Sequence, residues 1–410
     1  MTFKKDRQFY RFAAYGFLKN LRFFEPFIIL YFREMGFSFL EIGTLYSIRE
    51  ITTIICELPT GFVADIYGRR RSMVASMLAY ITSFIIFYLF PNFYSFSLAM
   101  VLFGIGEAFR TGTHKALILE HLRQKDILAL RVDYYGATRA ASQLGSALNA
   151  ILAAGLVFFS GSYRIIFPAA IIPYLINLIN LATYPKALDR EVRRTEKRRT
   201  WGDFLLVFRS RDSRRGIFNS GVFDAFFKTG QEYLQPILKS LALALPVMMA
   251  LSGRERTAIL VGGVYFLIYL TTSYASRNAG RLSRKIGHKE RTLNLTFLAG
   301  AALLAMAGGS IGVGIPAMAI VFFLLLFLLQ NARRPINITY ISEKISHRAM
   351  ASGLSAESQI KTLLMAILAP AVGFLADRFG IGSAMITAGA AMGILSAGVW
   401  LHRNRNGAKP

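Results

Sequence analysis

The residues of this sequence that could do chemistry are charged side chains within long apolar stretches. Asp224, Lys228 and Glu232 follow one another at intervals of four, so a helix would place one lysine between two carboxylates. A lysine that changes partners between two carboxylates can couple charge movement to a conformational change. A charge at bilayer depth is costly unless it is paired or faces water. We therefore expect a role in transport, with an intrahelical salt bridge as the alternative.

Three other apolar stretches carry charges that could line a cavity. Arg22 and Glu25 are three residues apart and would share one face of a helix, as would Glu107 and Arg110. For Arg22 and Glu25, local pairing is the alternative to a place on the cavity wall. Glu50 lies near the middle of its stretch, where a carboxyl group can exchange a proton. The predicted substrate and proton pathway comprises Arg22, Glu25, Glu50, Glu107, Arg110, Asp224, Lys228 and Glu232.

Membrane-spanning helices must position these charges. Hydrophobic residues make up 54% of the 410 residues and charged residues 17%, which is too apolar for an ordinary soluble domain. A hydrocarbon core of roughly 30 Å needs about 20 helical residues, and stretches of this length predict about twelve spans in an all-α membrane protein. They lie near 12–34, 39–64, 72–90, 96–118, 135–159, 165–184, 216–240, 257–279, 292–310, 315–335, 351–375 and 382–402.

The net charge of +25 does not indicate a nucleic-acid partner, because the basic residues are spread over the connections between spans. Placing the N-terminus in the cytoplasm puts most of them on the cytoplasmic side, as the positive-inside rule requires. Lys19, Arg22 and Glu25 interrupt the first apolar segment, which is therefore not a cleavable signal. We expect a multi-pass protein of the inner (cytoplasmic) membrane with both termini cytoplasmic.

The clearest break in the pattern is the basic stretch 186–215. It predicts an N-terminal bundle over 1–185 and a C-terminal bundle over 216–410, joined by a linker that lies against lipid phosphates. An internal sequence repeat supports a division of the chain into two halves, because the stretch GFVADIYG at 61–68 recurs as GFLADRFG at 373–380. Glycines that merely space helices are the alternative. The apolar side of the linker comprises Trp201, Phe204, Leu205 and Phe208.

The stretch GFVADIYGRR at 61–70 closes the second predicted span and opens the third. It resembles the loop motif of the major facilitator superfamily, G-x-x-x-D-x-x-G-R-[RK]. The resemblance covers the whole chain in length, topology and central linker. It implies two pseudo-symmetric six-helix bundles, in a protein that we expect to be a monomer, and a motif that latches the inner gate. The predicted gating residues are Gly61, Asp65, Gly68, Arg69, Arg70 and the nearby Glu57.

Physical chemistry supports this motif independently of the resemblance. Asp65 would stand at a helix end, where it can accept hydrogen bonds from a neighbouring helix N-terminus or pair with Arg69 or Arg70. Gly68 would permit a tight turn. Two departures leave the subclass open. Met100 stands where the family's fourth-helix motif has arginine, and the fifth span lacks the Gly-Pro pair of many exporters.

The charges and the resemblance together predict a secondary active transporter of a small organic solute. We expect proton-coupled efflux of a drug-like or amphiphilic compound. One alternative is proton symport of a zwitterionic or anionic nutrient, with Arg22, Arg110 or Arg139 as the anion clamp. Another is a non-transporting receptor or lipid-handling protein. The sequence shows no catalytic constellation or nucleotide-binding loop, and Cys56 stands alone, so we expect no enzyme activity, cofactor or metal.

Overall fold

The computed structural model describes residues 5–189, 207–247, 249–345 and 350–402, and these ranges contain helices and no strand. The all-α fold expected from the sequence is therefore confirmed. In chain order the helices are α1 (Arg7–Lys19), α2 (Ile28–Glu34), α3 (Phe39–Tyr67), α4 (Arg69–Leu89), α5 (Phe93–Arg110), α6 (Thr113–Gln124), η1 (Leu128–Leu130), α7 (Arg131–Ser160), η2 (Tyr163–Ile165), α8 (Ile166–Ala182), η3 (Lys186–Asp189), α11 (Arg211–Gln231), α12 (Leu234–Ala244), α13 (Gly253–Ile286), α14 (Lys289–Gly312), α15 (Pro316–Lys344) and α16 (Met350–Gly398).

The chain divides into two compact units. Unit 1 comprises Met1–Phe37, Leu45–Lys197 and Ala242–Tyr269, and unit 2 comprises Ser38–Thr44, Arg198–Leu241 and Leu270–Pro410. The main boundary falls inside the expected linker. The first turns of α3 belong to unit 2, and the first half of α13 belongs to unit 1. Of the apolar side of the linker, Phe208 is described, whereas Trp201, Phe204 and Leu205 lie outside the described residues.

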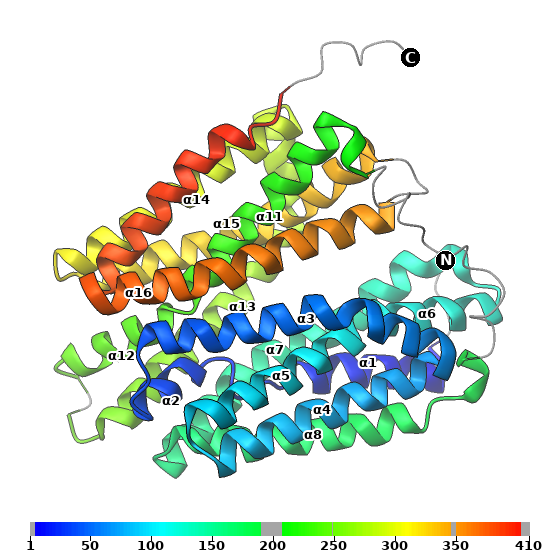
Figure 1. Cartoon of the computed structure of the whole chain (residues 1–410), viewed down its shortest axis with the longest axis horizontal. Helices are drawn as coiled ribbons and strands as arrows, with labels where there is room; N and C mark the ends of the chain where they lie inside the picture. Colours follow the sequence, from blue (N-terminus) through cyan, green and yellow to red (C-terminus); the bar gives the residue numbers. More distant parts are fainter. Residues whose placement is uncertain (1–4, 190–206, 248, 346–349, 403–410) are drawn as a thin grey trace. The chain divides into compact units, whose positions relative to one another are not determined.

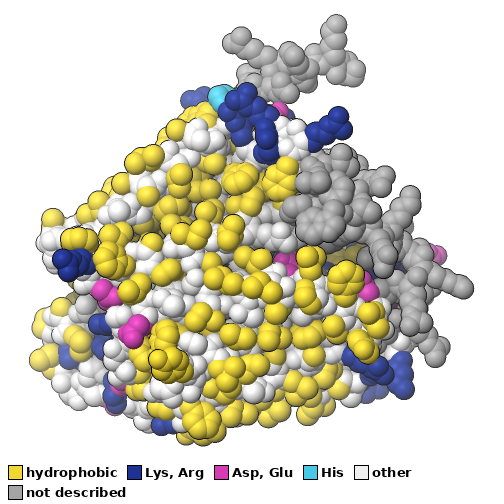
Figure 2. Space-filling view, in the orientation of Figure 1, with side chains coloured by type: hydrophobic (Ala, Val, Ile, Leu, Met, Phe, Trp, Pro, Cys, Tyr) yellow, Lys and Arg dark blue, Asp and Glu magenta, His cyan; other side chains and the backbone are white. Residues whose placement is uncertain are grey.

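Seven helices in the described ranges are long and apolar enough to cross a membrane. One of them, α16, covers two expected spans and turns at Gly380, whose φ of 84° suits glycine. Figure 2 shows hydrophobic side chains along the visible flanks of the helices. The expected spans without such a helix are those near 12–34, 39–64, 96–118 and 216–240. These four carry the charges singled out above, so the candidate chemistry lies on segments that miss the length or the hydropathy of the other spans.

Three of these four charged spans are broken helices. The first span consists of α1 and α2 with turns between them, and the fourth consists of α5 and α6, which meet at Gly112 with a φ of 75°. The seventh breaks between α11 and α12. The continuous helix expected for the first span is therefore wrong, and Arg22 and Glu25 lie in its break. Pro26 has no N–H and disfavours helical geometry in the residue before it, which accounts for this break.

Each unit packs its helices through small residues. In unit 1, α4 lies between α5 and α8 (Figure 1), and Ser76 and Ser83 of α4 donate hydrogen bonds to carbonyls of α5 at 2.6 and 2.7 Å. In unit 2, α11 and α14 pack on α16. A Cβ at Gly308 would lie 2.4 Å from the carbonyl oxygen of Gly382, so the backbones of α14 and α16 touch. Such close approach is typical of helices packed within a membrane.

The first turn of α3 is held by α16 within unit 2. The carboxylate of Asp377 accepts hydrogen bonds from the backbone N–H groups of Phe39, at 2.9 Å, and Leu40, at 2.7 Å. A Cβ at Gly373 would lie 2.3 Å from the carbonyl oxygen of Phe39, so this approach requires glycine. A carboxylate at a helix N-terminus satisfies free N–H groups and complements the helix dipole. The aspartate of the repeated motif thus caps a helix.

Candidate functional site

The charges of the first and fourth spans meet at Glu107 in unit 1. One carboxylate oxygen of Glu107 lies 3.1 Å from the guanidinium of Arg22, and the other accepts a hydrogen bond from Arg110. Arg110 also donates to the hydroxyl of Tyr80 at 3.3 Å. The break after α1 lets Arg22 reach α5, where it pairs with Glu107, and Glu25 also acts on Arg22 electrostatically. Sequence spacing correctly pairs Glu107 with Arg110, but the partner of Arg22 is a long-range one.

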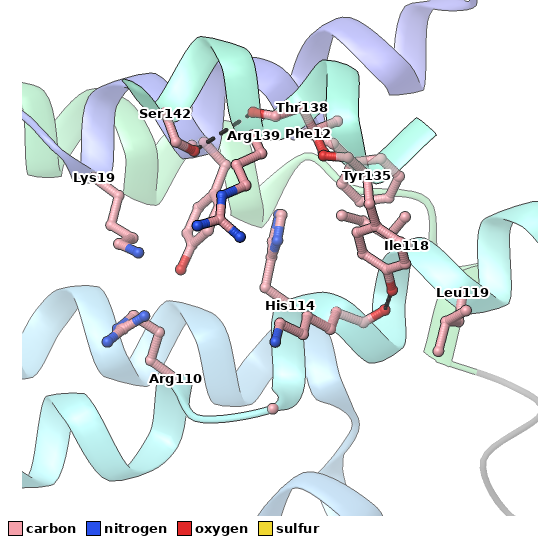
Figure 3. A pocket seen from close by; sticks show the side chains of 14 residues that line it. Phe12, Lys19, Arg110, His114, Ile118, Leu119, Tyr135, Thr138, Arg139 and Ser142 are labelled. Atoms are coloured by element: carbon pink, nitrogen blue, oxygen red, sulfur yellow. Dashed lines mark hydrogen bonds between the residues drawn. The ribbon is translucent and has the colours of Figure 1, made fainter. Parts of the chain in front are cut away.

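A cavity of about 500 Å³ lies beside this ion-pair group within unit 1. Its walls come from α1, α6, α7 and the end of α5. Figure 3 shows the side chains of Lys19, Arg110 and Arg139 converging on it from three helices. Lys115 of α6 also lines the cavity, and its carbonyl accepts a hydrogen bond from Tyr135 at 2.8 Å. A volume of this size suits a small organic molecule.

The charge around the cavity is positive. Its lining includes Lys19, Arg110, Lys115 and Arg139, and no aspartate or glutamate. The carboxylates that act on Lys19 are Glu25 and Glu107, and Glu107 is already bound by two guanidinium groups. The cations near the cavity therefore outnumber the carboxylates. Because guanidinium and ammonium groups bind carboxylate and phosphate oxygens strongly, the cavity favours an anionic ligand.

A histidine contributes a buried polar atom to the cavity wall. His114 stacks on Tyr15, with ring centroids 3.8 Å apart, and both residues line the cavity. The Nε2 atom of His114 is buried and has no hydrogen-bond partner among the described residues. Buried polar atoms are nearly always paired, so this atom needs an explanation. A ligand oxygen in the cavity would supply the missing partner.

Glu50 of α3 has a local partner. The guanidinium of the adjacent Arg49 folds back to within 2.5 Å of the Glu50 carboxylate, and it also lies over the ring of Tyr46 at 4.5 Å. A role for Glu50 in carrying protons stays a prediction, with Arg49 now identified as the partner that it would have to leave.

The predicted gating motif in unit 1 forms its expected turn at Gly68, whose φ is 100°. Asp65 is exposed, and within the described ranges its carboxylate has no hydrogen bond or ion pair. Arg69 is buried, and Arg70 donates to the carbonyl oxygen of Ala182 at 2.8 Å. A Cβ at Gly61 would meet no atom within 4 Å. The gating roles of these residues and of Glu57, which is partly buried on the same helix, stay predictions.

In the seventh span, the structure gives Asp224 a partner outside the predicted lysine bridge. Asp224 of α11 accepts a hydrogen bond from Gln330 of α15 at 2.6 Å and makes no ion pair with Lys228. Lys228 is exposed, and Glu232, at the helix break, accepts a hydrogen bond from Gln231 at 3.3 Å. The proposed exchange of Lys228 between two carboxylates stays a prediction. The sequence could not indicate that Asp224 is held by a neutral amide.

The structure adds polar residues that sequence reasoning missed. Glu357 of α16 accepts a hydrogen bond from Ser220 of α11 at 3.0 Å, and Ser220 accepts one from Asn337 of α15 at 3.0 Å. Glu357 falls in an apolar stretch, so the charge criterion used for the other spans would have found it. Arg333 of α15 is fully buried, donates to Thr296 at 2.9 Å and also binds Asn219. No cluster of metal-ligating side chains occurs in the described part of the chain.

Comparisons with known proteins agree with this architecture. Residues 12–357 match the model of the Major Facilitator Superfamily. A stretch of 107 residues is 31% identical to "Uncharacterized MFS-type transporter YxaM" of Bacillus subtilis (strain 168), and the match spans 26% of each chain.

Solved structures with the same fold include the nucleoside transporter NupG, with a TM-score of 0.76 at 12% identity, covering 96% of this chain and 98% of NupG. A D-xylose–proton symporter matches with a TM-score of 0.71 at 14% identity over 98% of both chains. A bacterial homolog of the human lysosomal transporter Spinster matches with a TM-score of 0.72 at 13% identity over 97% of both chains. At these identities the likeness concerns the fold. The match of the family model across most of the sequence identifies the chain as a member of the Major Facilitator Superfamily of membrane transporters.

Proposed function

We propose that this transporter moves a small organic anion across the cytoplasmic membrane by alternating access, coupled to protons. The observation that carries the proposal is the positively charged cavity of unit 1, where Lys19, Arg110 and Arg139 converge without a lining carboxylate. The free Nε2 atom of His114 supports it, since an anion's oxygen atoms would satisfy this buried atom. Cations on separate helices that hold one solute are suited to a carrier whose helices move during transport.

The cavity favours the anion alternative over the amphiphilic compound expected first. A cationic amphiphile would meet like charges on three sides of this cavity, which is unfavourable in a site of low dielectric. Sugar–proton symport, which is named for one of the structural relatives, shows that proton-driven transport occurs on this fold. Efflux of a drug-like compound remains the alternative, and the direction of the pH-gradient effect separates uptake from efflux.

The remaining features of the proposal follow from the sequence. The distribution of lysine and arginine supports cytoplasmic N- and C-termini in a multi-pass protein of the cytoplasmic membrane. The basic linker at 186–215 would bind anionic lipid headgroups on the cytoplasmic side. We propose a monomer as the working unit, because the cavity is lined entirely by residues of one unit of one chain.

Uptake by proteoliposomes tests the proposal. The purified protein is reconstituted and offered radiolabelled monocarboxylates, dicarboxylates, phosphorylated metabolites, zwitterions and organic cations, each with and without an inward proton gradient. We expect uptake of at least one anion class, stimulated by the gradient. The variant Lys19→Gln should raise the KM for that anion about tenfold, since a charge-assisted hydrogen bond contributes about 1.5–3 kcal/mol.

Lys125→Gln is the matched control, because it removes one positive charge from an exposed position of the same unit outside the cavity. This variant should transport like the wild type. Transport of cations but no anion would overturn the proposal, as would an equal KM for Lys19→Gln and wild type. If the proton gradient drove the anion out of the vesicles, the proposed anion site would stand and the proposed direction of transport would be reversed.

A further inference from the structure

Three helices of unit 2 form a short chain of hydrogen bonds that ends on a carboxyl group. Asn337 of α15 donates from Nδ2 to the hydroxyl oxygen of Ser220 of α11 at 3.0 Å. The Ser220 hydroxyl donates in turn to Oε1 of Glu357 of α16, also at 3.0 Å. Asn337 and Ser220 are buried, with 3% and 4% of their surface exposed, and Glu357 is partly buried. Glu357 lies in the candidate membrane-spanning segment that begins at Ser355, and Asn337 lies in the one over Pro316–Lys344.

The members of this chain can serve either protonation state of Glu357. A serine hydroxyl can donate to a carboxylate, and it can equally accept a hydrogen bond from a neutral carboxyl group. The Oδ1 atom of Asn337 is buried without a partner among the described residues. If Glu357 took up a proton, its O–H would donate to Ser220, and a half-turn of the Asn337 amide would let Oδ1 accept from the Ser220 hydroxyl. Every hydrogen bond of the chain then reverses and none is lost.

The charges around Glu357 lie at a distance from it. Asp224 of α11, Arg334 of α15 and Lys361 of α16 are the charged groups that act on it, and none forms an ion pair with it within the described ranges. Asp224 stands one helical turn beyond Ser220, so two carboxylates share this region of unit 2.

We propose that Glu357 binds the proton whose movement drives transport, with Ser220 and Asn337 as positioning residues. The inference rests on the proton coupling in the proposed function and places the coupling ion in unit 2, whereas the anion cavity lies in unit 1. The step is proton binding alone: water delivers the proton, an O–H bond forms at Glu357, and the carboxylate charge is neutralised. Glu107 is unsuited to this role because two guanidinium groups bind it directly.

Infrared difference spectroscopy of the purified, full-length protein tests proton binding without any substrate. Spectra recorded between alkaline and acidic pH should contain a protonated-carboxyl band that is lost in Glu357→Gln. Glu343→Gln is the control, because Glu343 is an exposed carboxylate that pairs with Lys289, and the band should persist in this variant. Ser220→Ala should shift the midpoint of the titration, and Ser220→Thr should restore it. An unchanged band in Glu357→Gln would overturn the proposal, as would its loss in Glu343→Gln.

Transport measurements separate this inference from the proposed function. With one proton coupled, a gradient of one pH unit supports about tenfold accumulation, since tenfold corresponds to 1.4 kcal/mol. In Glu357→Gln, gradient-driven accumulation of the transported anion should fall to the level without a gradient. Exchange of internal for external anion should continue, because exchange requires the cavity and alternating access but no net movement of protons. Equal loss of exchange and accumulation would assign Glu357 to substrate binding instead. If wild type moves no anion, the proposed function fails, and the infrared result still decides the proton site.

Discussion

The two units of the chain hold their charges in different ways. In unit 1 the carboxylate of Glu107 touches the guanidinium groups of Arg22 and Arg110. In unit 2 the carboxylates of Asp224 and Glu357 accept hydrogen bonds from an amide and a hydroxyl. The buried cation of unit 2, Arg333, is likewise bound by neutral oxygen atoms and lies 4.4 Å from the centre of the Phe223 ring. Among these groups, opposite charges meet in unit 1, whereas neutral groups hold the charges in unit 2; ion pairs of unit 2 such as that of Lys289 with Glu343 involve other residues.

This difference separates two tasks of a transporter. A direct ion pair fixes the protonation of both partners, because losing either charge leaves the other unpaired. Such a group can maintain the shape and the positive potential of a binding cavity while substrate binds and leaves. A carboxyl group held by a hydroxyl can exchange its proton, because the hydroxyl can donate or accept. This difference matches our proposals of a substrate site in unit 1 and a proton site in unit 2.

The largest expected effect is the loss of the carboxylate in unit 1. Glu107→Gln takes from Arg22 and Arg110, both partly buried, the carboxylate that they share, and removing one partner of a buried pair costs about 3–5 kcal/mol. Asp224→Asn in unit 2 should cost less than about 1.5 kcal/mol, because the new amide can still accept from Gln330. Thermal unfolding of the two variants in the same detergent measures the difference. Equal destabilisation would show that the units do not differ in how they hold charge.

Much of the fold could be predicted from the sequence, because lipid imposes a length and a composition on each spanning helix. The spans near 72–90 and 292–310 correspond to α4 and α14. The breaks in the charged spans could not be placed in the same way. A glycine such as Gly112 is tolerated within a helix, so its presence alone does not place a break.

The candidate site was partly predictable for the same physical reason. A charge in an apolar stretch is visible in one sequence, which is how Arg110 and Asp224 were found. Their partners are not visible, because Arg22 and Glu107 are 85 residues apart and Gln330 and Asp224 are 106 apart. Neutral residues such as Ser220 carry no compositional signal at all. Asp377 belongs to the internal sequence repeat, which the sequence shows, but its role as a helix cap follows from the fold.

The repeated motif extends the comparison to backbone packing, with a smaller effect. Gly373→Ala in unit 2 would place a Cβ 2.3 Å from a carbonyl oxygen of α3, and overpacking of this kind costs about 1–3 kcal/mol. Gly61→Ala in unit 1 meets open space within a helix and should stabilise by about 0.5–1 kcal/mol. The two variants should thus shift the unfolding temperature in opposite directions. A shift of the same sign in both would mean that the two copies of the motif pack alike.

The smallest expected effect separates the two aspartates of the motif. Asp377→Asn keeps one oxygen acceptor for the first turn of α3 but loses the second acceptor and the charge at the helix N-terminus. Loss of an N-cap side chain costs about 0.5–2 kcal/mol, and the retained acceptor places this variant near the lower limit. Asp65→Asn should leave stability unchanged, since the Asp65 carboxylate has no bound partner in the described ranges, and should still reduce transport if Asp65 gates the carrier.

Parallel measurement of unfolding and of proteoliposome uptake distinguishes these outcomes. A fall in stability confined to Asp377→Asn, with a fall in uptake for Asp65→Asn, would show that one sequence motif serves packing in unit 2 and conformational change in unit 1. Unchanged uptake in Asp65→Asn would contradict the gating role, because transport would then not depend on the Asp65 carboxylate. The same variants, compared at equal protein density in the vesicles, therefore test whether the division of tasks between the units extends beyond their charges.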